Sequence, residues 1–452
     1  MQAVLWGLRY PQFTRDGHRR YGATFTIRPG TMPAIVLTSD RDAIRRLLTG
    51  DPLAKQHGNH AVRPLIGERS VLLLEPAEHL ARRKLLLPPF HGERVRLYAQ
   101  LMQRLMDGQI DRWRPGDTVA VLPIAQDVTI EVILQAVLGI TDVAMRRRFR
   151  RLIDDLLFYP LGALRLRLAR RLAPRIALPQ RIREAAALAS ALPTPAVMTY
   201  FPELKGRSRW NVATRRWWRL RDRLYALFDE QIAATRTDPR LEERDDILAM
   251  LVQGRDEDGK PLTTEDLRDD LLTLIGAGHE TTAAAIAWGA VLLAHNPDAR
   301  ARATVAAREN DEQYLGALVK EVLRIRPPIP VAAGRALDEP FEIGPHRIPA
   351  GTLILIDAWG VHHDPEVYPD PESFQPERFL SDAPEPYTWL PFGGGAHRCI
   401  GSALAELEIK IALTTILGRV AVSPADAKLA PPARRAVTMV PHAGGRIKAS
   451  PA

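Results

Sequence analysis

The sequence predicts a mainly α-helical protein with small β-sheet regions, folded as one large domain that spans residues 1–452. Three observations support this fold class. Apolar residues recur at the i, i+3, i+4 spacing of helices through most of residues 41–323. Short strand-like segments bounded by glycine and proline are confined to the N-terminal region and to the part after residue 326. No linker, repeat or abrupt change of charge interrupts the chain, which favours one domain over several.

The composition is that of an ordinary globular protein with a basic excess. Hydrophobic residues make up 46% and charged residues 25%, and 62 Lys and Arg against 53 Asp and Glu give a net charge of +9. The excess is mostly arginine spread through helical stretches, which indicates a solvated surface rather than a nucleic-acid site. The single cysteine excludes a disulfide within the chain and fits a reducing compartment.

The N-terminal region lacks the features of a secretory signal. Residues 1–20 contain four arginines and no apolar core. The longest apolar run, 283–294, has 12 residues and is too short to cross a bilayer. These observations predict a cytoplasmic protein without a membrane anchor.

The elements of the N-terminal half begin with a predicted β-hairpin. Residues 24–27 and 34–37 have strand character, and Arg28-Pro29-Gly30 between them is typical of a turn. Helical spacing of apolar residues then predicts helices over 95–113, 125–138, 145–158 and 212–232.

A long helix is predicted over about 264–296. Thr263 or Thr264 is a suitable N-cap, acidic residues follow it, and Pro297 ends the segment. The second half is mostly apolar, so we expect this helix to cross the middle of the molecule.

A helix is predicted over 311–325, and Pro327-Pro328 ends it. After this helix the sequence no longer shows helical spacing of apolar residues. Residues 341–358 predict short strands, and 361–390 predict an ordered irregular stretch rich in proline and aspartate. A glycine-rich loop leads into a helix over about 400–417, and strand character returns near 436–440.

The only cysteine lies in that loop, in the sequence FGGGAHRCIG at 392–401. Three glycines permit a tight turn and close approach of the backbone to a ligand. Cys399 immediately precedes a helix, where free N–H groups and the positive end of the dipole lower the pKa of a thiol. His397 and Arg398 add positive charge. The pattern predicts an activated or metal-binding cysteine, with a buried, inert cysteine near a helix cap as the alternative.

This loop resembles the haem-binding signature of the cytochrome P450 superfamily, Phe-x-x-Gly-x-His/Arg-x-Cys-x-Gly, at every defined position. The resemblance implies a bacterial-type haem-thiolate monooxygenase with the P450 fold. Its haem b would lie between the long central helix and the Cys-loop helix, with Cys399 as the axial iron ligand. It further implies that His397 binds a haem propionate and that Phe392 contacts the haem.

A second motif lies inside the long helix, in the sequence AGHETT at 277–282. Gly276 and Gly278 cost helix stability and therefore suggest a kink or close approach to a ligand. The alternative for the threonines is back-bonding to a helical carbonyl. The motif is similar to the oxygen-activation motif of the family, which implies haem contact at Ala277, O₂ as co-substrate, and Glu280 and Thr281 as the catalytic acid and alcohol.

Further residues match the family pattern along the chain. Glu321, Arg324 and Arg378 resemble its buried ionic network, whose role is structural. His79 and Arg83, one helical turn apart, and Arg335 after the proline-rich turn occupy positions at which relatives bind haem propionates. A surface salt bridge remains the alternative for each arginine.

The resemblance also implies the partners. They are a hydrophobic small molecule (a terpenoid, fatty acid, steroid or other natural product), and a ferredoxin or flavodoxin with a NAD(P)H-dependent reductase. The expected active species is a monomer that binds no nucleic acid. Residues 160–210 combine leucines at helical spacing with interleaved arginines, which suggests a peripheral membrane contact or a solvated lid helix.

Three other functions compete with a monooxygenase. A non-catalytic haem sensor or a peroxide-using haem enzyme would have no need of Glu280 and Thr281. A cysteine nucleophile with His362 or His363 would leave the glycine loop and Glu321, Arg324 and Arg378 unexplained.

Overall fold

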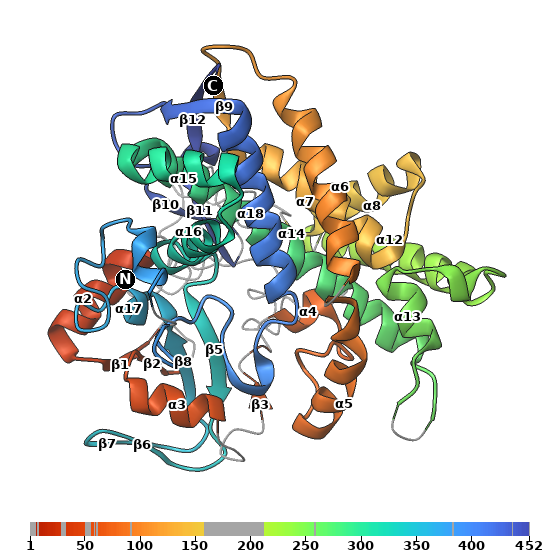
Figure 1. The fold of residues 1–452 in the computed structure, drawn as a ribbon. Helices are drawn as coiled ribbons and strands as arrows, with labels where there is room; N and C mark the ends of the chain where they lie inside the picture. The colour runs from red at the N-terminus through yellow and green to blue at the C-terminus, as the bar shows by residue number, and fades with distance from the viewer. Residues whose placement is uncertain are drawn as a thin grey trace, which may run out of the picture.

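A helix of 32 residues, α14 (Thr264–His295), runs through the middle of the protein (Figure 1). The structure is a computed structural model that describes residues 6, 9–28, 33–49, 56–57, 59, 62–90, 93–157, 212–256, 259–381, 384–435 and 437–451. Thr263 caps α14 in a capping box with Asp266, so the predicted N-terminus is confirmed. Most of the helix is buried, and three neighbours that cover it are α7 (Val121–Leu138), α16 (Glu312–Ile325) and α18 (Ser402–Arg419).

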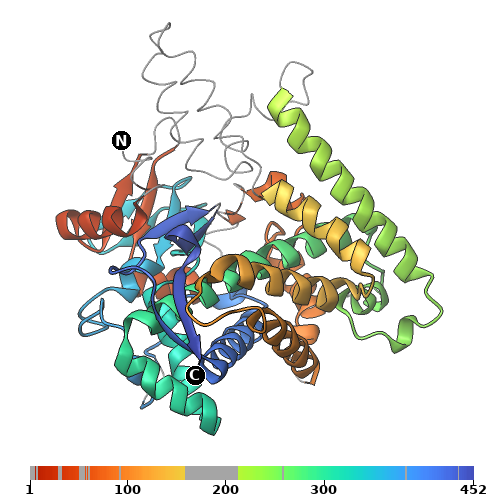
Figure 2. The same cartoon turned by 90° about the horizontal axis from the view of Figure 1, so that it is seen from above.

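Helices flank α14 on the side away from the large sheet. α8 (Val143–Leu157) and α12 (Val212–Arg236) lie side by side there (Figure 2). The buried Trp217 of α12 fixes this contact, because its indole N–H donates to the Leu156 carbonyl at 3.2 Å. Four shorter or more peripheral helices complete this side: α4 (Arg63–Ile66), α5 (Pro76–Leu86), α6 (Glu93–Ile110) and α13 (Ile247–Gln253).

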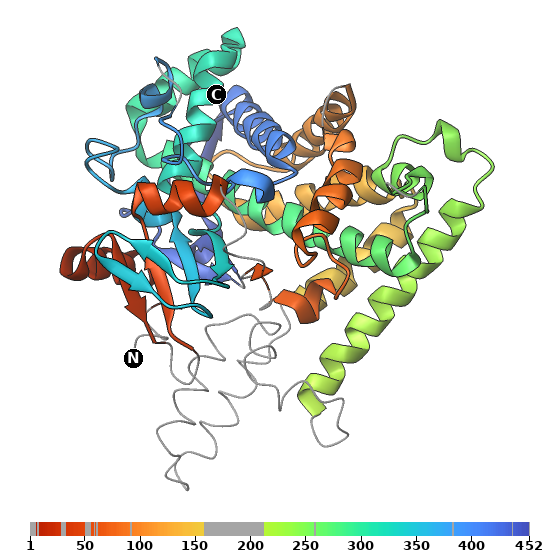
Figure 3. The ribbon, with the colours of Figure 1, turned by 90° about the horizontal axis from the view of Figure 1, so that it is seen from below.

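A five-stranded sheet forms the opposite side, with α3 (Arg41–Thr49) lying against it and α2 (Tyr10–Tyr21) beside β1 (Figure 3). Its strand order is β1-β2-β8-β5-β3. Thr24 pairs with Thr38 and Ile27 with Ile35, so the strands of the predicted hairpin are confirmed, while the turn at 29–32 lies outside the described residues. The strands are β1 (Thr24–Ile27), β2 (Ile35–Thr38), β3 (Gln56–His57), β5 (Val331–Ala336) and β8 (Leu353–Asp357).

The remaining elements belong to the C-terminal half and to small sheets. Helices α15 (Pro297–Glu309) and α17 (Ala358–His362) follow α14 and β8. The predicted strands over 341–358 and near 436–440 are confirmed. The small sheets contain β4 (Thr118–Ala120), β6 (Phe341–Ile343), β7 (His346–Ile348), β9 (Val420–Pro424), β10 (Pro432–Arg435), β11 (Thr438–Pro441) and β12 (Arg446–Pro451).

Helix α7 differs from the expectation drawn from apolar runs. Among the described residues it is the one helix long and apolar enough to cross a membrane, and 67% of it is buried inside the protein. Scattered polar residues such as Gln126 and Glu131 hide it from a search for uninterrupted apolar runs. Its packing against α14 makes it a core helix in this fold.

Candidate functional site

The loop at 392–401 folds back on itself before α18 begins. The Cys399 N–H donates to the Phe392 carbonyl at 2.9 Å, which closes the loop. Gly393 and Gly395 adopt φ angles of +65° and +63°. A Cβ atom on Gly395 would overlap the Leu48 carbonyl oxygen, so this position needs glycine for both its conformation and its space.

The Cys399 side chain is exposed, although protein surrounds it closely enough to desolvate a charge. Burial raises the pKa of the thiol, and the Gly401 N–H, Arg83 and Arg398 lower it by less. The expected lowering of the thiol pKa is therefore wrong for the protein alone. The predicted donors and cations are present, but desolvation outweighs them. A bound metal ion would add the positive charge that deprotonates such a thiol.

Helix α5 brings His79 and Arg83 to the cysteine loop. The His79 side chain is buried, and its ring lies 3.9 Å from the ring of His397. Arg83 is close enough to Cys399 for each to shift the pKa of the other. The structure therefore gathers four of the predicted cofactor-binding residues from two distant parts of the sequence.

Arg335 is a buried cation close to the cysteine loop. It lies on β5 with 8% exposure, and its guanidinium donates to the Gly334 carbonyl at 3.1 Å. Among the described residues it forms no ion pair, and burial alone lowers its pKa. β5 also approaches the cysteine loop, because a Cβ on Gly393 would lie 3.1 Å from the Ala332 carbonyl oxygen. A buried cation without a carboxylate fits the propionate of a haem.

The middle of α14 contains an opening in an otherwise buried helix. Between Asp269 and Ala294, every residue is buried except Ala277, which is exposed, and Gly276, Gly278 and Thr281, which are partly exposed. The helix continues through both glycines without interruption. A Cβ on Gly276 would meet nothing within 4 Å, whereas Gly278 packs against Ile133 of α7. Helix packing therefore explains Gly278, whereas no described residue requires a glycine at Gly276.

Glu280 and Thr281 lie in this segment but have different partners. The Thr281 hydroxyl donates to the Ala277 carbonyl at 2.6 Å, which is the back-bonding expected as an alternative. The Glu280 carboxyl is buried and accepts from Gln126 of α7 at 2.6 Å. Arg435 of β10 lies 3.4 Å away and is 37% exposed. Burial raises the pKa of Glu280, and Arg435 and Gln126 oppose this rise.

Gln126 and Arg435 were not predicted as site residues. Arg435 also donates to Gln126 at 3.3 Å, so the two side chains hold Glu280 jointly. They lie 154 residues before and 155 residues after Glu280 in the sequence, and neither belongs to a local motif. Only the tertiary structure reveals them, because it brings Gln126 on α7 and Arg435 on β10 to Glu280 on α14.

The predicted ionic network assembles as a buried cluster beneath the irregular stretch. Arg324 binds both oxygens of Glu321, at 2.7 and 2.8 Å, and both side chains are 0% exposed. Arg378 lies 3.5 Å from the same carboxylate. Arg324 further donates to the carbonyls of His362, Pro371 and Ser373. The cluster thereby ties α16 to the chain that leads into the cysteine loop.

A second buried ionic cluster escaped the sequence analysis. Arg82 of α5 pairs with Asp266 at 2.9 Å and with Asp270 at 2.6 Å, both on α14. Asp269 accepts from the backbone N–H of Arg69 and from the hydroxyl of Tyr225 on α12. The acidic residues that follow the cap of α14 therefore join this helix to α5 and α12. Arg82 and Arg83 are adjacent in the sequence, and nothing in it indicates that Arg82 pairs with α14 while Arg83 lies near Cys399.

His362 and His363, the alternative partners of a cysteine nucleophile, have structural contacts. The Leu390 N–H donates to His362 at 2.8 Å, and burial lowers the pKa of His362 to about 3. The His363 ring stacks on Trp359 with centroids 4.1 Å apart, and burial holds its pKa well below its usual value. Both rings are neutral parts of the core.

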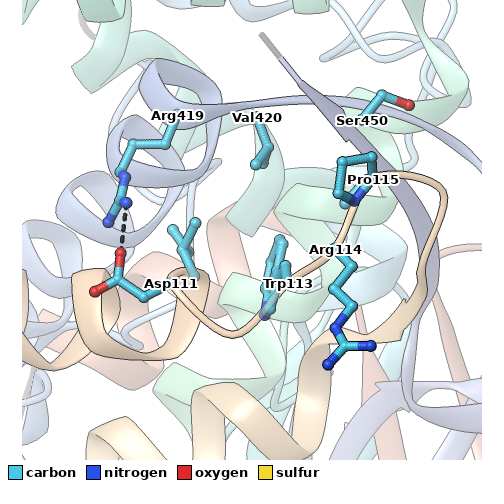
Figure 4. A pocket seen from close by; sticks show the side chains of 9 residues that line it. Asp111, Trp113, Arg114, Pro115, Arg419, Val420 and Ser450 are labelled. Carbon is cyan, nitrogen blue, oxygen red and sulfur yellow. Dashed lines mark hydrogen bonds and ion pairs between the residues drawn. The ribbon is translucent and has the colours of Figure 1, made fainter.

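A surface pocket of about 280 Å³ lies apart from these groups, between the end of α6 and strand β12 (Figure 4). Trp113, Pro115 and Val420 supply apolar surface, and Arg419 at its edge pairs with Asp111. None of its lining residues is a predicted site residue.

Comparison with known proteins gives one consistent result. The family model described as cytochrome P450 matches residues 6–448. A Mycobacterium tuberculosis protein provisionally named cytochrome P450 135B1 is 35% identical over 459 aligned residues, covering 99% of this chain and 89% of the relative. Another from the same organism, provisionally named cytochrome P450 137, is 33% identical, covering 96% of this chain and 84% of the relative. The solved structure of the cyanobacterial CYP120A1 with retinoic acid bound has a similar fold, with a TM-score of 0.80, 23% identity and coverage of 99% and 96%.

Proposed function

The chain belongs to the cytochrome P450 family, and from that premise we propose that it oxidises a hydrophobic small molecule with electrons from separate redox proteins. The family is that of haem-thiolate monooxygenases, which use haem b and O₂. The observation that carries the proposal is the opening at Ala277 and Thr281 in the buried helix α14. Such an opening suits both a cofactor face and an apolar substrate.

We assign the cofactor contacts to the residues gathered around the cysteine loop. Cys399 would ligate the iron through its thiolate, supported by the Gly401 N–H and by Arg83. Arg335, Arg83 and the paired rings of His79 and His397 would hold the propionates. Phe392 and Ala277 would contact the ring. When bound, the haem supplies the iron at which O₂ is activated.

Glu280 and Thr281 would deliver protons and order water on the substrate side. Glu280 is held by Gln126 and Arg435, and Arg435 extends to the surface, so this group connects solvent to the interior of α14. The Thr281 hydroxyl donates to the Ala277 carbonyl in this structure, and its oxygen can accept a hydrogen bond from a donor at the opening in α14. Both roles are general acid chemistry at a partly dry site.

The cluster of Glu321, Arg324 and Arg378 would have a structural role. It fixes backbone carbonyls of the stretch that leads to Cys399. A distorted stretch would misplace the thiolate, so haem retention would depend on this cluster.

The substrate would be a terpenoid, fatty acid, steroid or similar natural product, hydroxylated or epoxidised. CYP120A1 binds retinoic acid in its solved structure, which makes an apolar carboxylic acid a reasonable member of a screen. Electrons would come from a ferredoxin or flavodoxin and a NAD(P)H-dependent reductase. We further propose a cytoplasmic monomer that binds no nucleic acid. The predicted membrane contact at 160–210 lies outside the described residues and stays a hypothesis, which binding to anionic but not neutral vesicles would support.

The CO difference spectrum of the reduced protein tests the thiolate assignment. The wild-type protein should show the band of a thiolate-ligated haem, and Cys399→Ser should lose it while the fold is retained. A wild-type protein without haem, or an unchanged spectrum in Cys399→Ser, would overturn the assignment. A spectral shift screen across fatty acids, terpenoids, steroids and retinoic acid then identifies the substrate class.

A further inference from the structure

Arg434 on β10 carries a charge that the described part of the chain does not balance. Its side chain is only partly exposed, and its guanidinium forms no hydrogen bond or ion pair with a described residue. The Nε atom is buried. Burial lowers the pKa of Arg434, and only Tyr10 opposes this shift. A guanidinium in such surroundings costs stability unless an anion balances its charge.

Arg326, at the end of α16, provides an internal comparison. It is also buried and also forms no ion pair with a described residue. Its guanidinium donates to the Ile325 carbonyl at 2.7 Å and lies 5.5 Å from the ring centres of both Trp288 and Trp359. Arg434 has one ring contact, at 5.9 Å, and donates to no described carbonyl. The fold therefore accommodates the first charge and leaves the second without a comparable set of partners.

The register of the hairpin formed by β10 and β11 decides which way Arg434 faces. Arg434 is paired with Met439, and Arg435 is paired with Thr438. Directly opposed residues lie on the same face of a strand pair, and successive residues lie on opposite faces. Arg435 reaches Glu280 on α14. Arg434 therefore shares the other face with Met439.

That second face meets an aromatic and apolar wall at the N-terminal helix α2. Met439 packs with Tyr10, and the side chains of Trp6 and Val331 lie against the same cluster. The ring of Tyr10 is the one that contacts Arg434. The indole N–H of Trp6 is buried and has no acceptor. The surroundings of Arg434 thus combine apolar side chains with a further N–H donor, which suits the polar end of an apolar ligand.

The carboxylate that contacts this wall is already engaged. Asp357 is fully buried, and it accepts from the Tyr10 hydroxyl at 3.0 Å and from the Gly360 N–H at 2.9 Å. It also pairs with His18 at 2.8 Å. Asp357 is not among the groups that shift the pKa of Arg434. An anion that balances Arg434 would therefore come from a ligand and not from Asp357.

The hairpin also lies beside the candidate site. Trp288 of α14 donates to the Met439 carbonyl at 3.0 Å, seven residues after Thr281. Seven helical residues correspond to about 10 Å. Strand β5 starts in the same apolar cluster, and its Ala332 carbonyl lies against the cysteine loop. A ligand held at Arg434 therefore needs an apolar body that spans about 10 Å to reach the opening in α14.

We propose that Arg434 is a specificity residue that binds the carboxylate of an elongated apolar acid. The inference rests on the proposed function and narrows its substrate class to long apolar monocarboxylic acids. A planar guanidinium matches a carboxylate with two parallel hydrogen bonds, and one positive charge is balanced by one negative charge. Trp6 supplies a further N–H donor at the same wall. The far end of the acid then lies at the opening in α14, so oxidation takes place far from the carboxyl group.

The test measures binding to the haem-loaded protein by the shift of the haem spectrum. Two matched pairs of probes differ only in charge at one end: retinoic acid and retinol, and dodecanoic acid and dodecanol. The wild type should bind each acid at least about tenfold more tightly than its alcohol. Arg434→Leu should weaken acid binding at least about tenfold and change alcohol binding less than about twofold. The matched control is Arg15→Leu on α2, an exposed arginine paired with Glu372, and it should keep the wild-type preference.

Thermal unfolding supplies a readout that needs no ligand. Because a surrounded guanidinium without an anion is destabilising, Arg434→Leu should raise the unfolding midpoint of the ligand-free protein. Arg15→Leu should leave the midpoint nearly unchanged. Dodecanoic acid should raise the midpoint of the wild type by more than that of Arg434→Leu.

Three results would overturn the proposal. Equal binding of acids and alcohols by the wild type would remove the preference that Arg434 is proposed to create. An acid preference that survives in Arg434→Leu would assign it to another residue. A lower unfolding midpoint in Arg434→Leu, whether or not any probe binds, would make Arg434 a structural cation of the Tyr10 cluster. A wild type without the thiolate CO band would instead refute the proposed function.

Discussion

Replacement of Glu321 by alanine should cost the protein a large part of its stability and its haem. The carboxylate accepts both Arg324 bonds and the backbone N–H of Gln375 at 2.8 Å, in surroundings with no solvent exposure. Glu321→Ala leaves the Arg324 charge buried with carbonyl partners only, and orphans the Gln375 N–H. Breaking a buried pair costs about 3–5 kcal/mol, and a backbone N–H left without its acceptor adds about 1–3 kcal/mol, which gives a total of about 4–8 kcal/mol.

Urea unfolding of the purified variant, together with haem content per chain, measures this effect. A domain stability of about 5–15 kcal/mol leaves little margin, so we expect protein that is expressed but lacks haem. The matched control is Glu377→Ala, which breaks an ion pair with Arg302 at 2.5 Å whose side chains are 40% and 56% exposed. This control should cost less than about 1 kcal/mol. A Glu321→Ala variant with normal haem and a loss no larger than that of the control would refute the reasoning.

Three further changes test other parts of the structure. His279 is buried and its pKa is lowered to about 3, so the free energy of unfolding should fall by about 1.4 kcal/mol per pH unit as the pH drops below 6.5. Urea titrations at pH 5 and pH 8 should show a smaller loss for His279→Asn than for the wild type. An identical pH dependence in the two proteins would contradict this prediction. Arg82→Gln should lower the free energy of unfolding by about 3–5 kcal/mol at pH 8. The loss should be smaller below pH 6, because the pKa of the buried Asp270 is raised to about 6 and its carboxylate then takes up a proton. A loss that does not change with pH would argue against this pairing. Gly395→Ala should displace the cysteine loop from Leu48 and abolish the thiolate CO band, and a wild-type spectrum would show that the loop tolerates a Cβ there.

The local chemistry of the site could be predicted from the sequence because it depends on short spacings. Cys399 with its glycines, Glu280 with Thr281, and Glu321 with Arg324 are each separated by no more than a few residues. Helical periodicity and the Thr263 cap similarly determine α14, since both are properties of neighbouring residues. Those signals specify which groups exist and on which element they lie.

The surroundings of these groups could not be predicted in the same way. The expected low thiol pKa of Cys399 is wrong because burial raises the pKa by more than the Gly401 N–H, Arg83 and Arg398 lower it, and burial is set by the tertiary packing. The role of Arg82 could not be predicted either, because its partners lie 184 and 188 residues away in the sequence. Helix α7 was not recognised as an apolar helix because polar residues interrupt its apolar run, and their partners are found only in the folded protein.

The sequence by itself therefore determined the long helices, the strands of the hairpin, the motifs and the family of this protein, because each is encoded by residues close together in the chain. Only the tertiary structure decided which charges are paired, which carboxyl groups keep a proton and where a buried helix is open. Glu406 and Glu408 on α18 illustrate the difference. Burial raises the pKa of the Glu408 carboxyl to about 8, whereas the cations Lys320, Arg398 and Lys410 oppose the rise at Glu406. Desolvation and ion pairing act through space, and their strength is set when distant segments pack together.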